Sequence, residues 1–239
     1  DGKTLVNTST TPPNLPSMNS VVKANPEAGF SVVKYTGNSS GGSGNVGHSL
    51  GAAPDMIIFK TRDAGDNWAI YHSSLGVAYL EFTTQAQGGN AQNRWSSLPT
   101  SSVINLGSDT NINTKNHIMY TWTAVKGFSA FGSYTGNGSS DGPFVHTGFR
   151  VAWLMIKNAS TAGETWTIYD STRDVDNTAK QRLQPNSNDA ESVGSSARFK
   201  DLLSNGFKIR GTSGEQNTSG DVYIYAAFAE HPFKTARAR

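Results

Sequence analysis

Gly127-Phe128-Ser129 and Tyr134-Thr135-Gly136-Asn137 stand near the middle of the chain, and the same two phrases occur earlier as Gly29-Phe30-Ser31 and Tyr35-Thr36-Gly37-Asn38. Phrases of this length rarely recur by chance when the residues around them match as well. A recurring phrase at a long, fixed spacing indicates that one structural unit has been copied. The sequence therefore predicts two copies of one unit, with the second copy starting at the middle phrase.

The matches continue through both copies in the same order. Matched stretches are Met56 to Lys60 with Trp153 to Lys157, Trp68 to Ser73 with Trp166 to Ser171, Arg94 to Leu98 with Arg198 to Leu202, and His117 to Trp122 with Tyr223 to Phe228. The spacing between matched residues grows from 98 at Trp68 to 106 at Trp122. The second copy therefore carries a net insertion of about eight residues, which falls between Ser171 and Arg198.

The composition favours strands and turns over helices. The chain of 239 residues contains 25 glycines and many Ser, Thr, Val and aromatic residues. Runs such as Met56 to Phe59 are long enough for a buried strand and too short for a helix. We therefore expect an all-β fold with two tandem β-sandwich repeats packed together, residues 29–126 and residues 127–239.

Residues 1–28 differ in character from both copies. Pro12, Pro13, Pro16 and Pro26 interrupt this leader, and proline removes a donor that a central strand needs. The leader is therefore predicted to be an extended arm or linker. Its apolar residues, among them Leu5 and Val22, indicate that it packs on a surface. That surface is either a neighbouring chain in a homo-oligomer, for which a trimer is the favoured state, or its own body.

Charge and composition exclude several classes of partner. The net charge of +2 is too small to indicate nucleic acid or an anionic membrane. The chain has no cysteine, so it has no disulfide, no thiolate metal site and no Cys nucleophile. No apolar run approaches the roughly 18 residues of a membrane span. We expect no cofactor, no nucleic acid partner and no membrane insertion.

The tryptophans are predicted to be core residues. Positions that stay large and apolar in both copies are most simply buried, and every tryptophan has such a partner. The prediction names Trp68, Trp166, Trp122 and Phe228 as largely buried. The alternative is an exposed tryptophan that stacks on a sugar ring.

Catalytic and metal chemistry find little support in the residue pattern. The histidines lack the spacing of a zinc site, and no Gly-x-Ser-x-Gly elbow occurs. Asp170, Asp174 and Asp176 lie close together in sequence, and they suggest either a calcium or glycosidase site or an ordinary solvated turn. We favour the solvated turn and expect no metal and no catalytic residue. Residues 197–204, before Asn205-Gly206, could form one helical turn.

Three long stretches resemble a repeated domain of tail-fibre and other virion proteins of bacteriophages, many of them marine. The stretches are Gly29 to Asn38 with Val46 to Pro54, Gly132 to Val145, and Ala227 to Lys234. The resemblance covers residues 29–239 and marks no catalytic residue. It implies a non-enzymatic virion surface protein, a tail-fibre or receptor-binding module that contacts other virion proteins and a bacterial surface glycan or protein. The alternatives are a tail-associated glycan-cleaving enzyme and a capsid decoration protein.

If the chain binds a receptor, the contact is expected where the two copies differ. Framework positions are common to both copies, whereas recognition is commonly placed on loops that a scaffold holds. The first candidate is a polar loop with an aromatic neighbour, namely Tyr79, Gln85, Gln87, Asn90 and Gln92. The second is the insertion, residues 172–195, which carries Asp174, Asp176, Asn186 and Asn188. Amides, carboxylates and one aromatic face are the groups that sugars commonly require.

Overall fold

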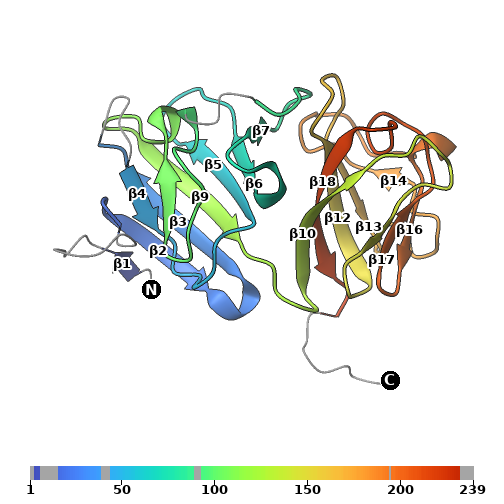
Figure 1. Cartoon of the computed structure of the whole chain (residues 1–239), viewed down its shortest axis with the longest axis horizontal. Helices are drawn as coiled ribbons and strands as arrows, with labels where there is room; N and C mark the ends of the chain where they lie inside the picture. The colour runs from blue at the N-terminus through green and yellow to red at the C-terminus, as the bar shows by residue number, and fades with distance from the viewer. Residues whose placement is uncertain (1–2, 6–15, 39–43, 89–92, 194, 232–239) are drawn as a thin grey trace. The chain divides into compact units, whose positions relative to one another are not determined.

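The computed structural model describes residues 3–5, 16–38, 44–88, 93–193 and 195–231 (Figure 1). The chain forms two compact units. The first comprises residues 1–81 and 87–124, and the second comprises residues 82–86 and 125–239. The division after Ala124 lies two residues before the boundary predicted from the sequence. Every strand and turn of the described residues agrees with the predicted all-β class.

The first unit contains a seven-stranded antiparallel sheet with the order β1-β2-β3-β9-β5-β6-β7. Its strands are β1 (Lys3–Leu5), β2 (Ser20–Asn25), β3 (Phe30–Thr36), β5 (Met56–Thr61), β6 (Ala69–His72), β7 (Tyr79–Glu81) and β9 (Asn116–Trp122). A second sheet pairs β4 (Gly44–Gly47) with β8 (Val103–Leu106). Short 3-10 turns are η1 (Pro26–Ala28), η2 (Ser73–Leu75) and η4 (Ser108–Thr110).

The second unit contains a four-stranded antiparallel sheet with the order β10-β18-β12-β13. Its strands are β10 (Ser129–Thr135), β12 (Val151–Asn158), β13 (Thr167–Asp170) and β18 (Val222–Ala229). A three-stranded sheet, β11-β17-β16, joins β11 (Phe144–His146), β17 (Gly206–Ile209) and β16 (Lys200–Leu203). A short hairpin pairs β14 (Gln181–Arg182) with β15 (Ser192–Val193), and η5 (Ser196–Arg198) follows it.

Each unit has one hydrophobic core to which both of its larger sheets contribute. In the first unit, Val33 and Met119 of the main sheet share a cluster with Val46 and Ile104 of the small sheet. Strand alternation produces this arrangement, because β9 buries every second residue from His117 onward. The cluster of the second unit likewise combines Leu154 and Tyr223 of its main sheet with residues of β11 and β17.

The main sheets of the two units follow the same order of matched strands. The order is β3-β9-β5-β6 in the first unit and β10-β18-β12-β13 in the second, with the strands matched in that sequence. The register agrees as well: Met56 lies opposite Trp122, and the matched Trp153 lies opposite Phe228. An equal strand order with an equal register is what a shared hydrophobic pattern specifies.

A pair of asparagines closes the same loop in both units. The Asn111 side chain accepts a hydrogen bond from the backbone N–H of Asn38 at 3.0 Å and donates to its side-chain oxygen at 3.2 Å. Asn217 makes the same two contacts with Asn137, at 2.8 and 3.1 Å. Both Asn111 and Asn217 are buried, so these bonds satisfy polar groups inside the loop.

The structure corrects the prediction of an extended arm. Within the leader, residues 20–25 form β2, which pairs with β3 across a tight turn at η1. Met18 and Val22 are buried in the core of the first unit. Pro26 begins the turn rather than interrupting the strand, so no ladder donor is lost. For residues 16–28, the alternative of packing on the chain's own body is therefore the correct one; residues 6–15 lie outside the described residues.

The tryptophan prediction is right at Trp166 and wrong at Trp68, and Trp122 and Phe228 are only half-buried. Trp166 is only 1% exposed, but the matched Trp68 is 38% exposed. Trp122 and Phe228 are half-buried on the face of their sheet that points away from the core. A large apolar residue at matched positions thus indicates an apolar surface, and burial depends on what covers that surface.

The suggested helical turn at residues 197–204 is also wrong. Residues 196–198 form a single 3-10 turn, and Lys200–Leu203 is strand β16, which forms a hairpin with β17 through Ser204-Asn205. Gly206 pairs with Leu203 as the first residue of β17, so it does not end a helix. Among the described residues, no helix has the length and apolar character required to cross a membrane.

Candidate functional site

The insertion of the second unit is fixed at its base by one arginine. The Arg173 guanidinium contacts the Asp170 carboxylate at 2.6 Å and the Glu191 carboxylate at 2.8 Å. It thereby ties the first residues of the insertion to residues near its end. Burial would raise the pKa of the Asp170 carboxyl, but the hydrogen bonds and charge of Arg173 outweigh burial and lower that pKa.

Two of the predicted receptor-binding residues hold the insertion in place instead. The Asp174 side chain is buried, and its carboxylate accepts the backbone N–H groups of Lys180 and Gln181 at 2.8 and 2.7 Å. The side-chain oxygen of Asn186 accepts the backbone N–H of Trp166 at 2.9 Å. Neither oxygen points toward solvent, so both residues serve the fold of the loop. The prediction of a solvated acidic turn is therefore wrong for Asp174, whereas Asp176 is exposed.

The other predicted residues of the insertion are exposed. Asp176 and Asn188 have solvent-accessible side chains. Val175 and Val193 accompany them and are 72% and 67% exposed, respectively. Two aliphatic side chains this exposed on a firmly anchored loop provide apolar contact area beside polar groups. The exposed surface of the insertion therefore combines apolar and polar side chains.

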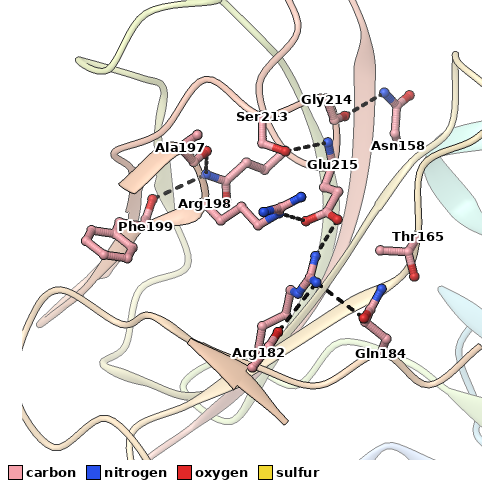
Figure 2. Close-up of polar contacts among 12 residues, drawn as sticks. Asn158, Thr165, Arg182, Gln184, Ala197, Arg198, Phe199, Ser213, Gly214 and Glu215 are labelled. Carbon is pink, nitrogen blue, oxygen red and sulfur yellow. Dashed lines mark hydrogen bonds and ion pairs between the residues drawn. The ribbon is translucent and has the colours of Figure 1, made fainter. Parts of the chain in front are cut away.

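A largely buried ion cluster links Arg182 of the insertion to Arg198 and Glu215, which lie outside it (Figure 2). The guanidinium groups of Arg182 (β14) and Arg198 (η5) converge on the Glu215 carboxylate from two sides. Arg182 bonds one carboxylate oxygen, and the Nε of Arg198 lies 2.8 Å from the other. The side chains of Glu215 and Arg182 are only 9% and 11% exposed, so removing one partner would leave a charge in a poorly solvated place.

A buried lysine lies close to this cluster. Lys200 of β16 has no exposed surface, and its Nζ lies 3.1 Å from the centre of the Tyr169 ring. The same amine donates to the backbone oxygen of Arg198 at 3.2 Å. Burial lowers the pKa of Lys200 well below its usual value, while the Glu215 carboxylate acts in the opposite direction. Burial likewise raises the pKa of Tyr169.

The cluster has the geometry of a structural ion pair. Each oxygen of Glu215 accepts a hydrogen bond from a guanidinium group, and these two bonds fix the orientation of the carboxylate. Burial raises the pKa of the nearby Glu164 carboxyl, and the charge of Glu215 adds to that effect. In the part of the chain that the structure describes, no three His, Asp or Glu side chains are close enough to hold a metal ion.

The candidate loop around residues 79–92 divides into packing and exposed residues. Tyr79 of β7 packs against the core, and the guanidinium of Arg94 lies 5.3 Å from its ring centre. The backbone of Gly88 packs directly against the same tyrosine ring. A side chain at this position would not fit, because its Cβ would lie only 2.4 Å from the ring. Gln85 and Gln87 are exposed. Asn90 and Gln92 lie outside the described residues.

The sequence contained a signal for the ion cluster that our prediction did not use. Arg94 matches Arg198, and Asp109 and Glu215 are both acidic at the spacing of 106 found for the following strand. In the first unit the same pair is looser, with Arg94 Nε 3.9 Å from the carboxylate of Asp109. An Arg–acid pair at matched positions of the two units indicates a framework ion pair.

Comparison with known protein families identifies a match. A family model described as a domain of unknown function (DUF7483) matches residues 6–232, which is most of the chain. No curated protein and no solved structure matches it.

Proposed function

We propose that this chain, which belongs to the DUF7483 family, is a non-enzymatic structural or attachment module of a bacteriophage particle. In this role it is exposed on the virion, contacts other virion proteins and binds a glycan or protein on the bacterial surface. The proposal rests first on the resemblance of residues 29–239 to repeated domains of phage tail-fibre and virion proteins.

The proposal includes an origin of the fold by duplication. Two tandem homologous β-sandwich repeats would explain the common order of four strands, the common register and the equivalent asparagine pairs. A duplicated framework leaves room for differences in its loops, because the core pattern alone specifies the strand order.

The observation that carries the attachment role is the anchored insertion of residues 172–195. Its base is held by Arg173 and Asp174, and a buried ion cluster supports the hairpin that contains Arg182. Its exposed side chains combine apolar Val175 and Val193 with polar Asp176. A rigid loop that displays such a mixture loses little conformational entropy on binding.

Labelling and competition together test the role. Antibodies raised against the purified chain should label particles in lysates of its phage, and the free chain should block adsorption of those particles to host cells. The double variant Val175→Ser, Asn188→Ala should keep the fold and lose most of the blocking. Leu98→Ser, which changes an exposed leucine of the first unit, is the matched control and should block like the parent.

The outcomes also separate the alternatives. Label confined to the phage head, without blocking, would favour a capsid decoration protein. New reducing ends after incubation with host polysaccharide would favour a glycan-cleaving enzyme. Unlabelled particles would reject a virion location altogether.

We also propose a homo-oligomer, with a trimer as the favoured state. Several copies would convert weak single-site contacts into strong attachment without any new contact. Light scattering on the full chain at micromolar concentration tests this assembly, and a monomer would reject it.

A further inference from the structure

The outer face of the first unit's main sheet carries an aromatic pair that is partly open to solvent. Trp68, which precedes β6, is 38% exposed, and the half-buried Tyr120 of β9 lies beside it. Their ring centres are 6.5 Å apart, and the two ring planes differ by 29°. The two stacked rings form one apolar surface, and the exposed part of Trp68 makes that surface accessible to a ligand.

The matched position in the second unit shows what this framework position accepts. There Trp166 is buried, and the ring of Phe82, a residue of the same unit, packs edge-on against it at 5.2 Å. The second unit thus fills the place beside its tryptophan with a ring of its own. In the first unit, the only ring partner of Trp68 among the described residues is Tyr120, and the tryptophan keeps exposed surface.

Three cations share the outer face with this platform. Lys34 and Lys60 flank Ile118 in one row of the sheet, and Arg62 follows two residues after Lys60. Lys34 and Arg62 are exposed, and the amine of Lys60 donates to the backbone oxygen of Asp66. Within the described ranges, none of these three cations takes part in an ion pair with a carboxylate.

We propose that this face binds a segment of an acidic polysaccharide. One sugar ring lies with its C–H groups on Trp68 and Tyr120, and the carboxylate or sulfate groups of the polymer lie toward Lys34 and Arg62. Uncompensated cations next to an apolar aromatic surface complement a ligand that is flat, apolar on one side and anionic at its edge. The site lies on the first unit and does not depend on the virion role or on the insertion.

The observations favour a polysaccharide over single-stranded nucleic acid. Three cations can neutralise only a few charges, and the whole chain has a net charge of +2. A nucleic acid groove tracks one phosphate per nucleotide and needs a longer run of cations than this. Uronic acids and sulfated sugars supply fewer charges together with an apolar ring face.

Affinity electrophoresis of the full-length chain tests the proposal. Native gels contain alginate, dextran sulfate or neutral dextran as the immobilised polymer. At least one of the anionic polymers should retard the parent chain and neutral dextran should not. Trp68→Ala leaves the net charge unchanged and should weaken the retardation by roughly tenfold. The double variant Lys34→Gln, Arg62→Gln should be retarded less than the parent, and the difference should shrink as the salt concentration rises. The control variant Leu98→Ala should be retarded as strongly as the parent.

Three results would overturn the proposal. The parent could migrate freely through both anionic polymers. Trp68→Ala, folded as shown by an unchanged melting temperature, could be retarded like the parent, which would reduce the effect to net charge. Finally, an equal charge concentration of oligo(dT) could abolish the retardation while alginate oligosaccharide does not, which would assign the face to nucleic acid.

Discussion

The two units solve the same packing problem with different chemistry. In the first unit, Tyr71 packs edge-on against the buried Trp95, with ring centres 5.9 Å apart. In the second, the matched Tyr169 lies against the amine of Lys200 at 3.1 Å. An aromatic ring needs only apolar neighbours, but a buried amine requires acceptors and a compensating charge. The second unit therefore has the Arg182–Glu215–Arg198 cluster close by, where the first has a looser and more exposed pair.

The largest difference between the units should appear at the matched tryptophans. Trp166→Ala should reduce the free energy of unfolding by roughly 3–5 kcal/mol, because it leaves a cavity in a packed interior. Trp68→Ala should cost less than about 1 kcal/mol, since its side chain is already partly in water. Urea denaturation of both variants measures the two effects. Equal losses of unfolding free energy would show that Trp68 contributes as much to stability as Trp166 despite its exposure.

The ion clusters should give the next largest contrast. Glu215→Gln keeps the shape of the side chain but leaves two guanidinium groups without their carboxylate, and it should cost about 3 kcal/mol. The matched Asp109→Asn should cost less than about 1 kcal/mol, because Asp109 is 45% exposed and 3.9 Å from Arg94. Thermal unfolding of both variants compares them. A mild effect at Glu215 would mean that solvent reaches the cluster.

These contrasts show why the sequence predicted the framework better than the surface. The repeated phrases determine the core pattern, so the all-β class and Trp166 in the core were predicted correctly. The exposure of Trp68 could not follow from the same pattern, because burial depends on whether another segment covers the ring. Asp174 was misjudged for a similar reason. Its role depends on backbone N–H groups six and seven residues further along the chain, and the loop conformation that brings them close has no sequence motif.

The stability of the second unit should depend on alkaline pH through Lys157, which matches Lys60 of the first unit. Its amine donates to the backbone oxygen of Glu164 at 2.6 Å, and burial lowers its pKa to about 8. Above that pH the folded chain has lost this proton, whereas the unfolded chain keeps it until its ordinary pKa of about 10.4. Stability should therefore rise with pH in this window, by at most about 1.4 kcal/mol per pH unit.

The variant Lys157→Met isolates this effect, since other titrating groups are common to both proteins. The free energy of unfolding of the parent, minus that of Lys157→Met, should increase between pH 8 and pH 9.5. Parallel pH profiles for the parent and Lys157→Met would contradict the depressed pKa.

The smallest expected effect concerns one backbone position that the units occupy with different residues. Thr114 and Gly220 both have a left-handed backbone, with φ of 62° and 86°. Each donates its N–H to the glycine of the repeated phrase, Gly37 or Gly136, at 2.9 and 3.0 Å. A β-branched residue is strained in this conformation, and glycine is not. Thr114→Gly should therefore stabilise the first unit, but by less than about 1 kcal/mol, because glycine also gains entropy in the unfolded chain.

The reciprocal change completes the comparison. Gly220→Ala should destabilise the second unit by roughly 1–2 kcal/mol. An added Cβ at Gly220 meets no atom within 4 Å, so the cost would arise from the backbone alone and not from a clash. Differential scanning calorimetry of the two variants should show melting temperatures that move in opposite directions from the parent. Shifts in the same direction would mean that the loop changes its conformation to suit its residue, and that this part of the framework differs between the units.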